Sequence, residues 1–236
     1  MIDRELLQTT MAEWELNLTA SQIDRLEQYV ALLTQWSERM NLVAPSTLPE
    51  ATKRHLLDSF SLATTCQQAP ASLADIGSGA GLPGIPLAIL WPETEVLLIE
   101  SIGKKAEFLR HVAQELQLEH VLVEVERAEV VGRERRWREH FELVTARAVA
   151  NLATLAEYCL PLCKIGGMWL APKGFEIEPE VQDAEQAITI LGGQLRAVYN
   201  VNIPAEPVRS LVVVDKIAST PLTYPRTVGT PSKKPL

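Results

Sequence analysis

The chain has 236 residues and a formal net charge of −8, with 47% hydrophobic and 22% charged residues. This composition is typical of a folded soluble protein and excludes a disordered chain, a fibrous repeat and a disulfide scaffold. Apolar runs are far shorter than the about 20 residues of a membrane helix, and the charged start lacks a secretory signal. We therefore expect a cytoplasmic protein with no membrane partner, which binds nucleic acid only through local basic patches.

Residues 1–70 are predicted to form a helical extension that packs on the core. Ser21–Asp24 is typical of a helix start, because a serine cap is followed by an acid three residues later. Apolar residues then recur every three or four positions as one buried stripe, namely Ile23, Leu26, Val30, Leu33, Trp36 and Met40. A further helix is expected from about residue 50 to residue 65.

Residues 71–218 alternate short apolar runs with helical segments, which indicates an α/β core with a mostly parallel, twisted sheet covered on both faces. Only a loop separates the last two apolar runs, so we expect a terminal antiparallel strand pair. Residues 219–236 form a basic, proline-containing tail, either an arm that orders on RNA or a frayed terminus. The predicted strands are 73–76, 96–99, 121–125, 143–145, 167–171, 195–201 and 211–215, and the predicted helices of the core are about 104–116, 152–162 and 178–191.

A glycine-rich turn follows the first predicted strand, in the register Asp75-x-Gly77-x-Gly79-x-Gly81. Glycines let the backbone turn sharply and approach a ligand closely. Leu82 stands where a dinucleotide-binding loop would carry its third glycine. A carboxylate at Asp75 would repel a diphosphate but suits a ligand with an amine and a sulfonium. The turn therefore favours S-adenosylmethionine, with an NAD(P)-dependent oxidoreductase as the alternative.

Two further acids follow predicted strands and so belong to the same edge of a parallel sheet, where ligands bind. Glu100 comes after the second strand and is suited to both ribose hydroxyls, in NAD as well as in S-adenosylmethionine. Glu129, beside Ala128, comes after the third strand and is suited to an adenine amino group or to orienting the loop. A tight turn with surface acids is the alternative interpretation.

The fourth predicted strand ends near Arg147, where methyltransferase-like folds bind their substrate. The Asn/Asp-Pro-Pro-aromatic stretch that is typical of amine methylation is absent there. Cys159 and Cys163, assigned to the following helix, are poorly placed as nucleophiles for carbon methylation. An acceptor with its own lone pair remains, such as guanine N7, for which alignment and a suitable field suffice. Arg147 is the candidate catalytic residue, with a structural arginine as the alternative.

Several segments together carry a resemblance to a known family. They are Asn41-Leu42, Arg54-His55-x-x-Asp58-Ser59, Asp75–Leu87, Glu100-Ser101-x-x-Lys104-Lys105, Arg127-Ala128-Glu129, Ala146-Arg147-Ala148, Lys173-Gly174, Tyr224-Pro225-Arg226 and Gly229-x-Pro231-x-Lys233-x-Pro235-Leu236. With these segments the chain resembles the RsmG family, also called glucose-inhibited division protein B, which are 16S rRNA guanine-N7 methyltransferases.

The resemblance implies the class I, Rossmann-like S-adenosylmethionine methyltransferase fold. It implies methyl transfer from S-adenosylmethionine to N7 of a guanine, position 527, in the 530 loop of 16S rRNA. The expected partner is 16S rRNA or the small ribosomal subunit, with no metal and with a monomer favoured. A non-catalytic ribosome-assembly factor is the remaining alternative. Family positions for the cofactor fall on Gly77, Leu82, Ala128, Glu129 and Arg147, with Glu100 at the ribose.

Basic residues on several segments are predicted to contact RNA phosphates. Arg54, His55 and Asp58 share one helix face, and they either contact rRNA or form a packing network in which His55 and Asp58 pair. The predicted RNA-binding residues are Arg54, His55, Lys173, Arg226, Lys233 and Lys234.

Overall fold

The computed structural model describes residues 2–147 and 149–236, so Ala148 of the Ala146-Arg147-Ala148 motif lies outside the described residues. Within them, seven strands form one sheet in the order β3-β2-β1-β4-β5-β7-β6. Strands β1 to β5 are parallel, and β7 runs antiparallel to both β5 and β6. This confirms the predicted α/β sheet with its antiparallel terminal pair. The strands are β1 (Ser72–Ile76), β2 (Glu95–Ile99), β3 (Val121–Glu124), β4 (Phe141–Ala146), β5 (Cys163–Lys173), β6 (Gly193–Val201) and β7 (Arg209–Lys216).

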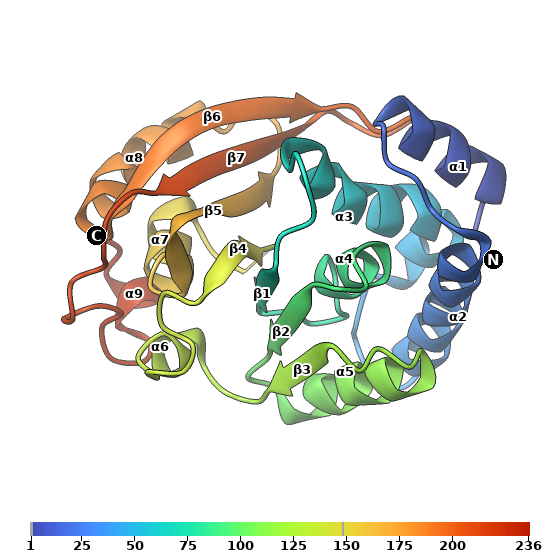
Figure 1. The fold of residues 1–236 in the computed structure, drawn as a ribbon, viewed down its shortest axis with the longest axis horizontal. Coiled ribbons are helices and arrows are strands. Elements are labelled where there is room, and N and C mark those ends of the chain that lie inside the picture. The colour runs from blue at the N-terminus through green and yellow to red at the C-terminus, as the bar shows by residue number, and fades with distance from the viewer. Residues whose placement is uncertain (1, 148) are drawn as a thin grey trace.

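Helices cover both faces of the sheet (Figure 1). Alternate residues of a strand point to opposite faces, so Leu73 and Leu98 join one apolar core while Ala74 and Ile99 join the other. The first core contains the apolar faces of α2, α4 and α5, and the second contains those of α7 and α8. The longer helices are α1 (Arg4–Glu13), α2 (Ala20–Ser37), α4 (Gly84–Leu90), α5 (Gly103–Glu115), α7 (Leu152–Cys159) and α8 (Glu178–Ile190), with the short helices α6 (Ala128–Val131) and α9 (Thr230–Lys233).

Helix α2 begins two residues earlier than the sequence predicts. Its N-cap is Thr19, whose side-chain hydroxyl accepts from the backbone N–H of Gln22. The side-chain oxygen of Gln22 in turn accepts from the backbone N–H of Thr19. This reciprocal capping box satisfies two backbone groups that a helix start leaves open, so the predicted start at Ser21 is wrong. The predicted apolar stripe is buried from Ile23 to Leu33.

The predicted helix from 50 to 65 is a series of differently wound turns. They are η1 (Pro45–Glu50, 3-10), η2 (Thr52–Leu57, π), α3 (Asp58–Phe60) and η3 (Ser61–Thr65, 3-10). A π-helical turn is rare and is frequently found at functional sites. Cys163 also differs from expectation, because it begins strand β5 instead of extending the helix that contains Cys159.

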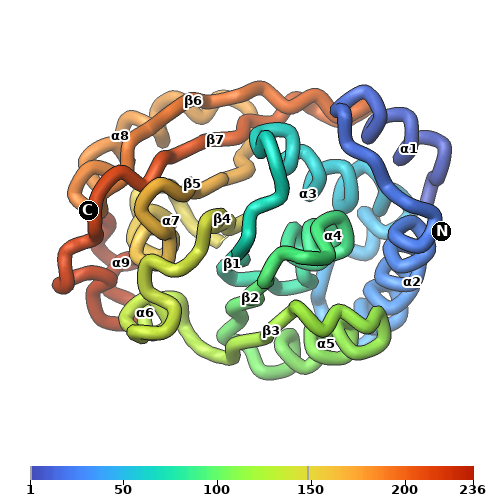
Figure 2. Tube along the Cα trace, in the orientation of Figure 1, coloured from blue at the N-terminus to red at the C-terminus, as the bar shows by residue number. Residues whose placement is uncertain are grey.

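Residues after β7 fold back beside α6 and α7 (Figure 2). The basic run at this end of the chain starts with Lys216, whose side chain is fully buried. Its Nζ donates to the carbonyl oxygens of Leu160 at 2.8 Å and Leu191 at 3.0 Å, and also to the Thr220 hydroxyl. Lys216 is therefore a structural cation that joins α7, α8 and the tail. None of the described helices is long and apolar enough to cross a membrane.

Candidate cofactor-binding site

The turn between β1 and α4 depends on its glycines. Gly77, Gly79 and Gly81 have φ angles of +66°, +56° and +85°, which side chains rarely adopt. A Cβ on Gly77 would lie 2.7 Å from Cγ2 of Val149, and one on Gly81 would lie 2.6 Å from Cγ1 of Ile85. A Cβ on Gly79 would meet only the Gly77 carbonyl, at 3.6 Å. Gly77 and Gly81 are thus required by packing, whereas the backbone at Gly79 faces open space where a ligand can approach.

Glu100 holds this turn from the end of β2. Its Oε2 accepts from the Gly79 N–H at 2.9 Å, and its Oε1 accepts from the Ile102 N–H at 2.7 Å. Each carboxylate oxygen has a second lone pair, so Glu100 can also accept from hydroxyl groups of a ligand. The same carboxylate therefore shapes the turn and offers acceptors beside it.

Asp75 is fully buried at the end of β1. Its Oδ2 accepts from the Gly84 N–H at 3.0 Å, whereas its Oδ1 has no hydrogen-bond partner within residues 2–147 and 149–236. Burial raises the pKa of the Asp75 carboxyl to about 7, against the lowering effects of the Gly84 N–H and the Arg147 charge. A buried acceptor without a partner is costly, and a ligand ammonium would satisfy it.

A cavity of about 230 Å³ opens beside the turn, at the carboxyl ends of the strands. Its walls include three predicted cofactor residues, Gly77, Ala128 and Glu129, together with Ile99. They also include Ser232 from the tail, which the sequence reasoning did not assign to the site. Leu82 is buried in the first apolar core instead. A larger hollow of about 740 Å³ lies at the opposite edge of the sheet, between the segment 65–70 that precedes β1 and the first residues of β4 and β5, and contains none of the predicted site residues.

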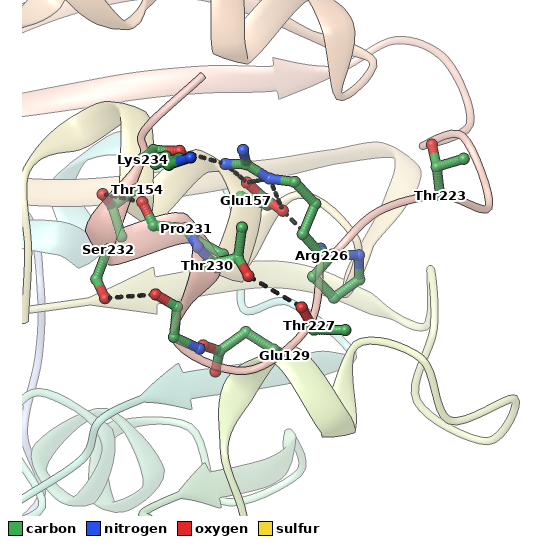
Figure 3. A network of polar contacts seen from close by, with 12 residues as sticks. Glu129, Thr154, Glu157, Thr223, Arg226, Thr227, Thr230, Pro231, Ser232 and Lys234 are labelled. Atoms are coloured by element: carbon green, nitrogen blue, oxygen red, sulfur yellow. Dashed lines mark hydrogen bonds and ion pairs between the residues drawn. The ribbon is translucent and has the colours of Figure 1, made fainter.

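Glu129 already has a partner in the chain. Its Oε1 accepts from the Gly229 N–H at 2.9 Å, across 100 positions of sequence (Figure 3). Glu129 is 4% exposed and lines the cavity from α6. Local spacing contains no signal for this contact, although the family-like tail motif includes Gly229.

Arg147, at the end of β4, is fixed by Asp58 from the N-terminal extension. Its Nη1 donates to Oδ2 of Asp58 at 2.6 Å, and Arg209 at the start of β7 pairs with Oδ1 of Asp58 at 3.1 Å. Asp58 thus joins two arginines at the edge that carries the glycine turn. Arg209 is not predicted from the sequence, because its contact with Asp58 spans most of the chain.

His55 does not pair with Asp58. Its Nε2 lies 2.9 Å from the Thr47 hydroxyl, and the side chain is buried. Burial, reinforced by the Arg147 charge, lowers the His55 pKa to about 4. The imidazole is therefore neutral at pH 7 and attracts no phosphate through charge.

The other predicted RNA contacts differ in accessibility. Arg54 pairs with Glu50 at 2.9 Å and with Glu206 at 3.3 Å. Lys173 donates to the Ala150 carbonyl at 2.8 Å and to Glu180 at 2.7 Å. Arg226 pairs with Glu157, whereas Lys233 and Lys234 are exposed. Contact of these residues with RNA stays a prediction.

Within the part of the chain that the structure describes, three or more His, Cys, Asp or Glu side chains nowhere gather closely enough to hold a metal ion. The polar groups at this edge of the sheet are the backbone of the glycine turn, the buried carboxylates of Asp75, Glu100 and Glu129, and Arg147. Of the three carboxylates, only that of Glu129 lines the 230 Å³ cavity in the part of the chain described.

Solved structures share this architecture. The structure described as M. jannaschii TYW2 in complex with AdoMet aligns with a TM-score of 0.56 and 16% identity, over 76% of this chain and 80% of that chain. The precorrin-6y C5,15-methyltransferase of Geobacter metallireducens aligns with a TM-score of 0.51 and 13% identity, over 75% and 91%. Strand order and site define the class I, Rossmann-like S-adenosylmethionine methyltransferase fold.

Comparison of sequences identifies the family, whereas comparison of structures identifies the fold. The family model described as rRNA small subunit methyltransferase G matches residues 22–210. A protein named ribosomal RNA small subunit methyltransferase G from Roseiflexus castenholzii is 52% identical over 94% of this chain and 95% of its own. One with the same name from Chloroflexus aggregans is 49% identical over 99% and 98%. The chain belongs to the rRNA small subunit methyltransferase G family, which confirms the predicted resemblance.

Proposed function

We propose that the chain methylates N7 of guanine 527 in the 530 loop of 16S rRNA, with S-adenosylmethionine as methyl donor. The observation that carries the proposal is the glycine turn: it is folded, open at Gly79, and joined to the Glu100 carboxylate. The relatives named above are rRNA small subunit methyltransferases, which supports an rRNA substrate. The exact base rests on the family resemblance of the sequence motifs.

Residues at the carboxyl ends of β1, β2 and β3 divide the binding of the cofactor among them. Glu100 accepts from the ribose hydroxyls, and Ala128 with Glu129 borders the adenine. Asp75, whose Oδ1 has no partner among the described residues, receives the ammonium of the methionine moiety. When bound, S-adenosylmethionine supplies an electrophilic methyl group on a sulfonium. Guanine N7 carries a lone pair and no proton, so the chain needs no general base.

Arg147 is the residue that we assign to the reacting end of the site. Its guanidinium is held by Asp58 and the side chain is 20% exposed, so Arg147 can still donate to a ligand carboxylate or to the guanine. Methylation at N7 places positive charge on the base. A second positive charge nearby would oppose this step, but the Asp58 carboxylate balances the charge of Arg147. Arg147 can then orient the two reactants through hydrogen bonds.

The test uses purified protein, labelled S-adenosylmethionine and small ribosomal subunits from cells that lack this methyltransferase. Label should reach guanine N7 in the 530 loop, where reduction and aniline cleavage locate it in the rRNA. Subunits that are already methylated at this base serve as the matched control and should accept no label. Label elsewhere, or none, contradicts the proposal.

Equilibrium dialysis separates the alternatives. S-adenosylmethionine should bind and NAD(P) should not, and the reverse result would favour an oxidoreductase. Cofactor binding without any methylated product would favour an assembly factor. With rRNA as substrate, we place the activity in the cytoplasm.

A further inference from the structure

We infer that residues 226–234, called here the C-terminal strap, form one wall of the cofactor pocket and that Ser232 contacts the bound cofactor. The inference rests on the proposed S-adenosylmethionine site but adds a residue and an element to it. It starts from Ser232, which lines the same cavity as Gly77, Ala128 and Glu129. Ser232 can contact the cofactor in a fixed position only if the strap is held against the rest of the protein. Three sets of contacts hold it.

The first anchor is an ion pair between Arg226 and Glu157 of helix α7 (Figure 3). The Glu157 side chain is 1% exposed, and Nη2 of Arg226 donates to its Oε2 at 2.6 Å. Nε and the backbone N–H of Arg226 donate to the same carboxylate. A buried carboxylate needs its charge balanced, and Arg226 does so from a position where the tail turns toward the cavity.

The second anchor holds the segment that leads into the strap. Arg133 donates to the carbonyl oxygens of Pro225 at 2.7 Å and Thr223 at 3.0 Å. Arg138 donates to the carbonyl oxygens of Tyr224 at 2.9 Å and Thr220 at 2.7 Å. Both arginines belong to a charge-rich run that reads as a basic patch in the sequence, and here they bind the tail.

The third anchor lies at the cavity itself. Gly229, with φ of +79°, turns the strap and donates its N–H to Glu129. The Thr154 hydroxyl donates to the buried Pro231 carbonyl at 3.2 Å, and the Ser232 hydroxyl donates to the Gly229 carbonyl at 3.2 Å. Ser232 is thereby fixed at the rim, next to the α6 residues that border the adenine. The position of the Glu129 carboxylate in turn depends on the strap.

These contacts make the strap a positioning element for the cofactor, in addition to the RNA contacts predicted for its exposed Lys233 and Lys234. Loss of the strap would open one side of the pocket and release Glu129, whereas the Arg147–Asp58–Arg209 cluster makes none of its contacts with the strap. Releasing the anchors of the strap should therefore raise the KM for S-adenosylmethionine more than the KM for ribosomal subunits.

The test measures binding of S-adenosylmethionine to the full chain by calorimetry, without RNA. Ser232→Trp places a large side chain at the cavity and should raise Kd at least tenfold. Val228→Trp is the matched control, because Val228 is in the same strap, is exposed and does not line the cavity. Its Kd should stay within twofold of wild type, and both variants should keep the wild-type melting temperature. Ser232 is exposed, so the substitution leaves the core intact.

Arg226→Gln gives a second readout that a merely structural role would not move. It should raise the KM for S-adenosylmethionine several-fold and change kcat and the KM for subunits little. Wild-type affinity in Ser232→Trp, or a raised KM for subunits alone in Arg226→Gln, overturns the inference. A wild-type chain that binds the cofactor but methylates no rRNA refutes the proposed function and leaves the strap result standing. A wild-type chain that binds no cofactor overturns both.

Discussion

Asp75 and His55 are buried groups whose pKa values are displaced in the direction that favours the neutral form. Burial raises the Asp75 pKa from 3.8 to about 7 and lowers the His55 pKa from 6.5 to about 4. The effects on stability have opposite signs. Between pH 4 and 7 the Asp75 carboxyl binds more protons in the folded state than in the unfolded state, so its contribution to stability falls as pH rises. Between pH 4 and 6.5 the His55 imidazole binds fewer protons in the folded state, so its contribution to stability falls as pH decreases.

Asp75→Asn should therefore become more stable relative to wild type as pH rises from 4 to 8. A shift of this size corresponds to about 4 kcal/mol of unfolding free energy. Urea unfolding at a series of pH values measures the difference. His55→Gln should also gain on wild type, but as pH falls from 6.5 to 4. Stability curves that stay parallel to wild type would contradict both assignments.

Glu100 connects two loops and is the predicted ribose acceptor. Glu100→Ala should weaken S-adenosylmethionine binding at least tenfold while circular dichroism stays that of the folded chain. The loss of two charge-assisted hydrogen bonds should also lower the unfolding free energy by about 1 to 3 kcal/mol. The matched control is Glu95→Ala, because Glu95 begins β2 at the opposite edge of the sheet and its side chain, among the residues that the structure describes, pairs only with His140 at 3.3 Å. Unchanged affinity in Glu100→Ala would remove the ribose assignment.

At the scale of single elements, two hydroxyl residues, Thr19 and Ser21, could each cap α2 according to the sequence alone. In the structure Thr19 is the cap. Thr19→Ala removes the capping box and should lower the unfolding free energy by about 1 kcal/mol. Ser21→Ala, two residues further on and inside the helix, should leave stability nearly unchanged. Urea midpoints of the two variants decide between the caps, and equal losses would contradict the structure.

Asp58 connects the N-terminal extension with β4 and β7. Asp58→Asn leaves Arg147 and Arg209 without their shared carboxylate, so unfolding free energy should fall by about 3 kcal/mol and kcat should fall with it. Adding Arg209→Gln removes one of the two uncompensated charges. The double variant should then lose less than the sum of the two single variants. Strict additivity in a double-mutant cycle would show that Asp58 does not couple to Arg209.

At the scale of the whole molecule, the sheet could be predicted because apolar periodicity and strand–helix alternation are local in sequence. The glycine turn and the acids at the strand ends could be predicted for the same reason. Contacts between distant segments have no such signal. Asp58 meets Arg147 across 89 positions, and Glu157 meets Arg226 across 69. Those contacts determine which arginines and lysines are paired with carboxylates inside the protein. Basic patches in the sequence therefore overstate the positive charge that is available for RNA.

Lys216 is one such cation that is bonded inside the protein, and its burial can be used to measure unfolding. Its amine is sealed from solvent between α7, α8 and the tail, and burial lowers its pKa. An acylating reagent should therefore spare Lys216 in the native protein while it modifies surface amines such as Lys233 within minutes. Once the molecule opens, the amine is reached. Peptide mass spectrometry of that one lysine would thus time global opening in a mixture, without purification of the unfolded form or an added dye.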